Sequence, residues 1–89
     1  MPSLRENFGR RLRSIRLQRE LTQEKFAGLT RISVDFLSLI ERGINAPSFE
    51  VLEQIAEGTR LPVMALFDFE SEPLPKRSST KRLQKRSRR

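Results

Sequence analysis

The side chains that could carry chemistry in this chain are carboxylates, guanidinium groups and amines, because its 89 residues include neither cysteine nor histidine. Without thiols and imidazoles there are no disulfides, none of the usual zinc ligand sets and no histidine-based acid–base catalysis. The carboxylates fall at positions expected on helical surfaces, where they form no convergent catalytic set. We therefore expect neither an enzyme nor a bound cofactor or metal, and a chain without cysteine fits a reducing compartment.

The basic residues are distributed unevenly along the chain. Residues 1–75 contain ten Arg or Lys and eleven Asp or Glu, whereas residues 76–89 contain eight basic residues and no acidic one. The formal net charge of +7 therefore comes from the C-terminal segment, and it suggests a polyanionic partner. The basic residues that could contact phosphates there are Lys76, Arg77, Lys81, Arg82, Lys85 and Arg86.

Hydrophobic residues make up 36% of the chain, which is enough for one small domain with a compact core. From Ser71 onward, prolines, serines and the charge run leave too few apolar residues to offset the entropy of ordering. We predict a folded domain over residues 1–70 and a basic, disordered tail over residues 71–89. No stretch has the apolar character of a signal peptide or of a membrane span of roughly 20 residues, so we expect a cytoplasmic protein.

The spacing of apolar residues predicts an all-α fold of five short helices. The first four begin at hydroxyl side chains that can cap a helix, namely Ser3 (in a capping box with Glu6), Thr22, Ser33 and Ser48. Their inner faces are predicted to consist of Leu4, Phe8, Leu12 and Ile15, then Phe26, Ala27 and Leu29, then Leu37 and Ile40, and then Phe49, Leu52, Ile55 and Ala56. We expect the third helix to stop at Gly43 and the fourth at Gly58.

A fifth helix is predicted over residues 62–69, where Pro62 suits the first turn. This segment is more apolar than one face of so short a helix requires. Two interpretations stay open: the apolar side chains close the core of the monomer, or they form the seam of a homodimer. The candidates for such a seam are Met64, Phe67 and Phe69.

The segments around the second and third helices resemble a known family. "LTQEKFA" (residues 21–27), followed by "ISVDFLSLIERGINAPSFEVLEQIA" (residues 32–56), is similar to the Xre/Cro-type helix-turn-helix family, to which the DNA-binding domain of phage lambda repressor belongs. The resemblance covers about residues 4–69 and implies a five-helix, lambda-repressor-like domain. It also implies double-stranded DNA as the partner, with the third helix in the major groove and the second lying across it.

The resemblance implies roles for residues on and around the third helix. Side chains that would touch base edges are Val34, Asp35, Ser38 and Leu39, and those that would contact phosphates are Gln23, Ser33, Arg42 and Asn45. Asp35 offers only acceptors, so its natural target is the exocyclic amine of cytosine, or less directly that of adenine. Alternatively, Asp35 only stabilises the positive end of the helix dipole. Packing is the alternative for Val34 and Leu39, which could otherwise cover a thymine methyl group, and Phe36 is expected in the core.

Two further positions follow from the same resemblance. Arg16 corresponds to an arginine that pairs, in relatives, with the glutamate found here as Glu41, although the two could instead be independent surface charges. The turn between the second and third helices commonly carries glycine, whereas this chain has Arg31, which would need a left-handed or otherwise adjusted turn.

By this resemblance the protein is expected to be a sequence-specific transcriptional regulator of the nucleoid, and repression is the simpler mechanism because occupying an operator needs no further contact. A homodimer would bind a near-palindromic operator. The alternative from another class is an adaptor that keeps the fold and binds RNA or an acidic protein through its tail, and the tail could also be merely solvated. Phage regulator, restriction-modification controller and antitoxin stay open, and no small-molecule effector is evident.

Overall fold

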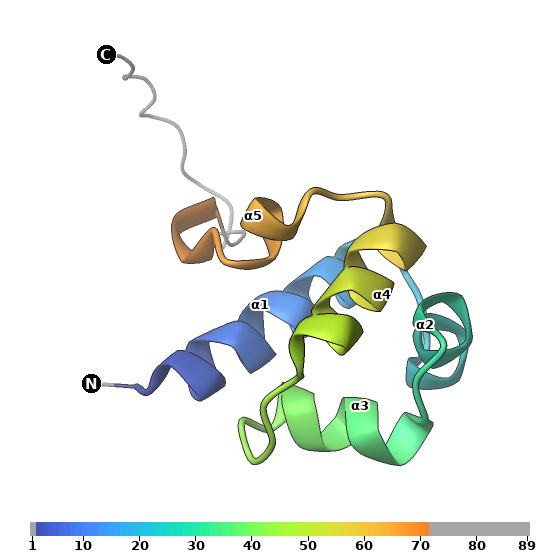
Figure 1. Ribbon diagram of the computed structural model, residues 1–89, viewed down its shortest axis with the longest axis horizontal. Helices are drawn as coiled ribbons and strands as arrows, with labels where there is room; N and C mark the ends of the chain where they lie inside the picture. The colour runs from blue at the N-terminus through green and yellow to red at the C-terminus, as the bar shows by residue number, and fades with distance from the viewer. Residues whose placement is uncertain (1, 72–89) are drawn as a thin grey trace.

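The computed structural model describes residues 2–71, and every element in this range is a helix (Figure 1). In chain order the elements are α1 (Leu4–Gln18), α2 (Gln23–Thr30), α3 (Val34–Glu41), α4 (Phe49–Thr59), α5 (Val63–Leu66) and the 3-10 helix η1 (Phe69–Ser71). The predicted all-α fold of five helices is therefore confirmed. Ser71, the first residue of the predicted tail, belongs to η1, and the rest of the tail, with all its phosphate candidates, lies outside the described residues. Within residues 2–71, no helix has the length and apolar character needed to cross a membrane.

The starts of the first four helices are fixed by local side-chain caps, as the sequence predicts. The hydroxyl oxygens of Ser3, Thr22, Ser33 and Ser48 each accept a backbone N–H three residues later, at 3.0–3.2 Å. The Ser3 N–H also donates to Glu6 Oε1 at 2.8 Å, which completes the capping box. Because each cap satisfies an N–H that the helix itself cannot, four hydroxyl residues set where the helices begin.

Helices α1 to α4 all end with a left-handed residue followed by an apolar one. The left-handed residues are Glu20, Arg31, Gly43 and Arg60, with φ between 59 and 77°. In each case the following residue donates its N–H to the carbonyl five residues earlier, at 2.9–3.1 Å, in the pairs Leu21 to Arg16, Ile32 to Ala27, Ile44 to Leu39 and Leu61 to Ala56. This is the Schellman pattern, which satisfies carbonyls at a helix end. Arg31 adopts the left-handed turn that the sequence requires of it.

Gly58 lies inside α4, so the prediction that it ends this helix is wrong. A Cβ at Gly58 would clash with the carbonyl oxygen of Leu29 in α2 and would lie 2.9 Å from its carbonyl carbon. Glycine is therefore needed here for close packing of α4 on α2, and the helix continues to Thr59. The left-handed residue comes two positions later, at Arg60.

Helices α1 and α4 cross the middle of the domain (Figure 1). The core fills the space between these two helices and the remaining ones. Its buried apolar side chains are Phe8, Leu12, Ile15, Phe26, Ala27, Leu37, Ile40, Leu52, Ile55 and Leu66. Three residues expected on inner faces, Leu4, Leu29 and Phe49, are exposed instead. Leu4 and Phe49 are the first residues of their helices and line an apolar hollow at the surface. Apolar spacing predicts a helical face, but not how far the neighbouring helix extends along it.

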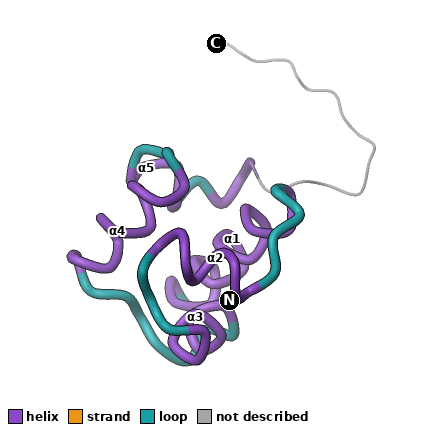
Figure 2. The backbone as a smooth tube through the Cα atoms, turned by 90° about the vertical axis from the view of Figure 1, so that its right-hand side faces the viewer, coloured by secondary structure: helices purple, strands orange, loops and turns teal. Residues whose placement is uncertain are grey.

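Helix α5 is shorter than predicted. Pro62 caps it instead of entering its first turn, and a turn at Phe67 separates α5 from η1. Leu66 is fully buried, and the half-buried ring of Phe67 lies 5.0 Å from that of Phe8 and 6.2 Å from that of Phe69. These contacts show that part of the apolar excess closes the core of the monomer. Figure 2 shows α5 and α3 on opposite sides of the domain.

Candidate nucleic-acid interface

Helix α3 presents the residues that the sequence analysis singled out as base-reading candidates. Asp35 is exposed in the first turn of α3, whereas Val34, Ser38 and Leu39 are half-buried. Val34 packs against the core, as Phe36 does, so part of its side chain serves packing. The most accessible polar group on this helix is therefore the Asp35 carboxylate, which can only accept hydrogen bonds while it is ionised.

The phosphate candidates lie at the two ends of α3 and at the start of α2. Ser33 precedes α3, and its hydroxyl already accepts the Phe36 N–H at 3.0 Å. Arg42 is exposed directly after α3, and Asn45 is half-buried in the following loop. The N–H of Asn45 donates to the Leu39 carbonyl at 3.3 Å, which holds this loop against the end of α3. Ser33 thus stands before α3 and Arg42 and Asn45 follow it, while Gln23 of α2 is linked to α3 by its hydrogen bond to Glu41.

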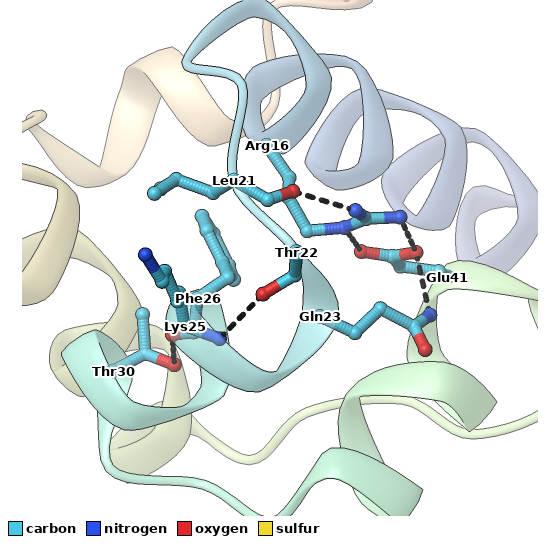
Figure 3. Close-up of polar contacts among 8 residues, drawn as sticks. All are labelled: Arg16, Leu21, Thr22, Gln23, Lys25, Phe26, Thr30 and Glu41. Atoms are coloured by element: carbon cyan, nitrogen blue, oxygen red, sulfur yellow. Dashed lines mark hydrogen bonds and ion pairs between the residues drawn. The ribbon is translucent and has the colours of Figure 1, made fainter.

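Arg16 of α1 and Glu41 of α3 form a buried ion pair, so they are not independent surface charges (Figure 3). Arg16 Nε donates to Glu41 Oε2 at 2.7 Å, and Arg16 Nη2 donates to Glu41 Oε1 at 3.0 Å. Arg16 Nη1 donates to the carbonyl of Leu21 at 2.9 Å, which links the pair to the α1–α2 connection. A two-point contact of this kind fixes the relative position of both groups.

Gln23, the first residue of α2, adds a third element to this pair. Its Nε2 donates to Glu41 Oε1 at 3.1 Å (Figure 3). The Glu41 carboxylate therefore accepts three hydrogen bonds, two from Arg16 and one from Gln23. Through these bonds the first three helices meet at one carboxylate, which lies at the last residue of α3.

The ion pair also affects the ionisation of its arginine. Hydrogen bonding to Glu41 raises the pKa of the Arg16 guanidinium above its ordinary value, and burial only partly opposes this. Because the pKa is higher in the folded state, the stabilisation is complete below the ordinary arginine pKa and is lost only as pH rises through the raised value. Arg16 therefore stays charged at neutral pH.

Several polar side chains that the sequence analysis missed link helices of the domain, and one of them, Gln54, reaches the turn before α3. Arg11 Nε donates to the Ala65 carbonyl at 2.9 Å, and Arg19 Nη1 donates to the Thr59 carbonyl at 2.7 Å. Gln54 Nε2 donates to the carbonyls of Thr30 and Arg31 at 3.1 and 3.0 Å, at the turn between α2 and α3. The available signal for Arg11 was its position beside Leu12 on the inner face of α1. For Gln54 we find no comparable signal, because its acceptors lie on another helix.

Comparison with known proteins shows that the arrangement of helices is shared with solved regulators. The clp gene regulator ClgR of Corynebacterium glutamicum superposes with a TM-score of 0.71 at 32% sequence identity, covering 78% of this chain and 90% of that one. The restriction-modification controller protein C.AhdI of Aeromonas hydrophila gives a TM-score of 0.67 at 27% identity, covering 70% of this chain and 94% of its own. The HTH-type transcriptional regulator DdrOP3 of Deinococcus deserti is 40% identical over 58 residues.

The DdrOP3 match includes 65% of this chain but only 45% of the relative, so the chain spans less than half the length of that protein. The sequence profile of the helix-turn-helix domain matches residues 7–66, which contain α2, α3 and the network around Glu41. This match includes most of the chain, and the solved regulators share its arrangement of helices. The chain therefore belongs to the helix-turn-helix domain family, in the Xre/Cro-like group that the sequence indicated.

Proposed function

We propose that this protein is a transcriptional regulator that reads double-stranded DNA with α3. The observation that carries the proposal is the presentation of α3: its outer side is accessible, and the Glu41 network holds its last residue to α1 and α2. The names of the similar proteins, which are regulators and a controller, support it. The major groove of B-DNA is about 12 Å wide and admits an α-helix of ordinary diameter.

The charges of α3 decide which residues we assign to base contacts and which to phosphate contacts. Residues 34–41 include no basic side chain, and the Glu41 charge is paired with Arg16. The attraction to phosphates is therefore assigned to residues around the helix, namely Gln23, Ser33, Arg42 and Asn45. Asp35 repels phosphates and is assigned to base reading, with the amine of cytosine as its target. Because the Asp35 carboxylate must stay away from phosphates, α3 can bind in few registers on DNA, and this favours sequence specificity.

Selection of bound duplexes from a random pool tests the proposal. The selection is carried out with the unmodified protein, with Asp35→Ala and with Glu50→Ala. Glu50 is a matched control because it is an exposed carboxylate in the first turn of another helix, α4. Both substitutions remove a helix-dipole contribution of about 0.3 to 1 kcal/mol to stability. Only Asp35→Ala should abolish a preference for a C·G pair, which a direct contact favours by about 1 to 3 kcal/mol, or roughly 5- to 150-fold.

Two results of this selection would count against the proposal. If no duplex is preferred over scrambled DNA, the domain does not read sequence, and the adaptor function takes its place. If the base preference of Asp35→Ala equals that of the unmodified protein at every position, Asp35 serves only the helix end. The selected sequences also report half-site symmetry and spacing.

We further propose that the protein acts as a homodimer on a near-palindromic operator and represses by occupying it. An apolar surface on α4, α5 and the start of α1 supports dimerisation, with Phe49 83% and Met64 81% exposed. Two hollows of about 340 and 270 Å³ share Phe49, Leu52 and Phe67 as lining residues. Of the three seam candidates, Met64 is the exposed one, whereas Phe67 and Phe69 are half-buried. A two-fold dimer would place two α3 helices about 34 Å apart.

Light scattering tests the dimer with Phe49→Gln and Met64→Gln, and with Leu17→Gln as control. Leu17 is an exposed apolar residue near the end of α1, whereas Leu4 and Phe8, which line a hollow, lie nearer its start. The first two changes should shift the mass from dimer towards monomer, and Leu17→Gln should leave it unchanged. A monomeric mass of the unmodified protein, both free and on DNA, would exclude the homodimer.

For residues 71–89 we propose a separate basic segment that adds phosphate contacts to those of the domain. The eight positive charges of residues 76–89 would increase the association rate and the nonspecific affinity. Removing residues 76–89 should reduce the slope of log affinity against log salt concentration by about 0.9 per lost contact. An unchanged slope would show that the segment is not a DNA contact.

A further inference from the structure

The hydrogen bond between Gln23 and Glu41 has a direction that chemistry alone fixes. An ionised carboxylate accepts hydrogen bonds and donates none, so the amide of Gln23 must turn its Nε2 towards Glu41. Its carbonyl oxygen Oε1 then points away from Glu41, as Figure 3 shows. One N–H of Nε2 is used in this bond. The other N–H of Nε2 and the Oε1 atom take no part in the bond to Glu41.

Glu41 is itself held firmly enough to act as a fixed acceptor. Its side chain is 3% exposed, and Arg16 donates a hydrogen bond to each of its carboxylate oxygens. Gln23 is half-buried and stands directly after the Thr22 cap, so its backbone is fixed by α2 as well. A long side chain that would otherwise sample several rotamers is therefore restrained at both of its ends.

We propose that Glu41 is a positioning residue for DNA recognition, which it serves by holding the Gln23 amide in one orientation. The inference rests on the proposed function, because it assigns Gln23 to the DNA contact. Held in this way, Gln23 offers DNA one N–H donor, suited to a phosphate oxygen, and one carbonyl acceptor beside it. Ordering the side chain before binding removes an entropy cost that corresponds to about a 2- to 12-fold change in affinity.

Side-chain amide NMR of the full chain tests the restraint without DNA. Gln54, which donates to two carbonyls, is the positive control, and Gln18, which is exposed, is the negative control. The Gln23 amide should show order parameters close to those of Gln54 and clearly above those of Gln18. Mobility equal to that of Gln18 would overturn the proposal. Because this measurement uses no DNA, its result stands even if no duplex is bound and the proposed function fails.

A double-mutant cycle on a selected duplex tests the functional part, at a temperature where every variant is folded. Glu41→Gln should weaken binding 2- to 12-fold in the unmodified background and leave it unchanged in the Gln23→Met background. A merely structural role of Glu41 would weaken binding equally in both backgrounds, and that result would overturn the proposal. If Glu41→Gln does not fold, the NMR comparison decides, because it needs only the unmodified chain.

Discussion

Two helix crossings in this domain are built alike, with α1 on α3 and α4 on α2. Each has a glycine that faces backbone carbonyls of the other helix, Gly9 against Ile40 and Glu41, and Gly58 against Leu29. Each also carries an Arg–Glu contact, Arg16–Glu41 at the first crossing and Arg31–Glu57 at the second. The two crossings differ in how deeply this contact is buried.

Burial gives the two contacts different consequences. The side chains of Arg16 and Glu41 are 9% and 3% exposed and share two hydrogen bonds, whereas those of Arg31 and Glu57 are 64% and 72% exposed and share one of 3.2 Å. Water and salt screen the exposed pair, but a buried charge that loses its partner keeps the full cost of its desolvation. The comparison teaches that an Arg–Glu contact becomes structurally important only where solvent cannot replace it.

The largest expected effect is that of Glu41→Ala, which leaves Arg16 buried without its partner. It should lower the free energy of unfolding by about 3 to 5 kcal/mol. Glu57→Ala, the matched change at the other crossing, should cost at most about 0.5 kcal/mol because its partner stays hydrated. Denaturant unfolding of both variants measures the difference. Equal midpoints would mean that burial does not separate the two pairs.

An intermediate effect is expected when either crossing glycine gains a methyl group. A Cβ at Gly9 would clash with the Ile40 carbonyl oxygen and lie 2.8 Å from that of Glu41. A Cβ at Gly58 would clash with the Leu29 carbonyl oxygen. Backbone atoms cannot rotate away as a side chain can, so the helices must move apart. Gly9→Ala and Gly58→Ala should each cost about 1 to 3 kcal/mol in thermal or denaturant unfolding.

The two glycine substitutions should also differ in their effect on the Gln23 amide. Gly9→Ala displaces the end of α3 and should loosen the Gln23 amide, whereas Gly58→Ala acts at Leu29, near the other end of α2 from Gln23. Amide NMR of both variants checks this. If Gly9→Ala leaves unfolding unchanged, α1 and α3 do not pack as closely as described.

The sequence predicts best what is decided locally. Hydroxyl caps at Thr22 and Ser33 are recognisable because the acceptor and its N–H are three residues apart. The prediction that Gly58 ends α4 is wrong because glycine occurs both at helix ends and where two helices pack closely, and only the position of Leu29 distinguishes the two cases. The bond from Gln23 to Glu41 was likewise beyond prediction, since it joins residues 18 positions apart whose geometry depends on the fold.

The smallest expected effect concerns Gly28, which, like Gly58, lies in the last turn of a helix but differs from it in surroundings. A Cβ at Gly28, which is exposed in α2, would meet no heavy atom within 4 Å. Gly28→Ala should therefore stabilise the domain by about 0.4 to 1 kcal/mol, because alanine restricts the unfolded chain and favours the helix.

Gly43→Ala is the control for this stabilisation, because Gly43 has φ +77° and its Cβ would lie 2.9 Å from Glu6 Cγ. That change should destabilise, since alanine at this φ is strained as well as crowded. Thermal unfolding of the two variants should shift in opposite directions. If Gly28→Ala also lowers stability, α2 meets a neighbour at this point, and the contrast between an open glycine and a crossing glycine no longer holds.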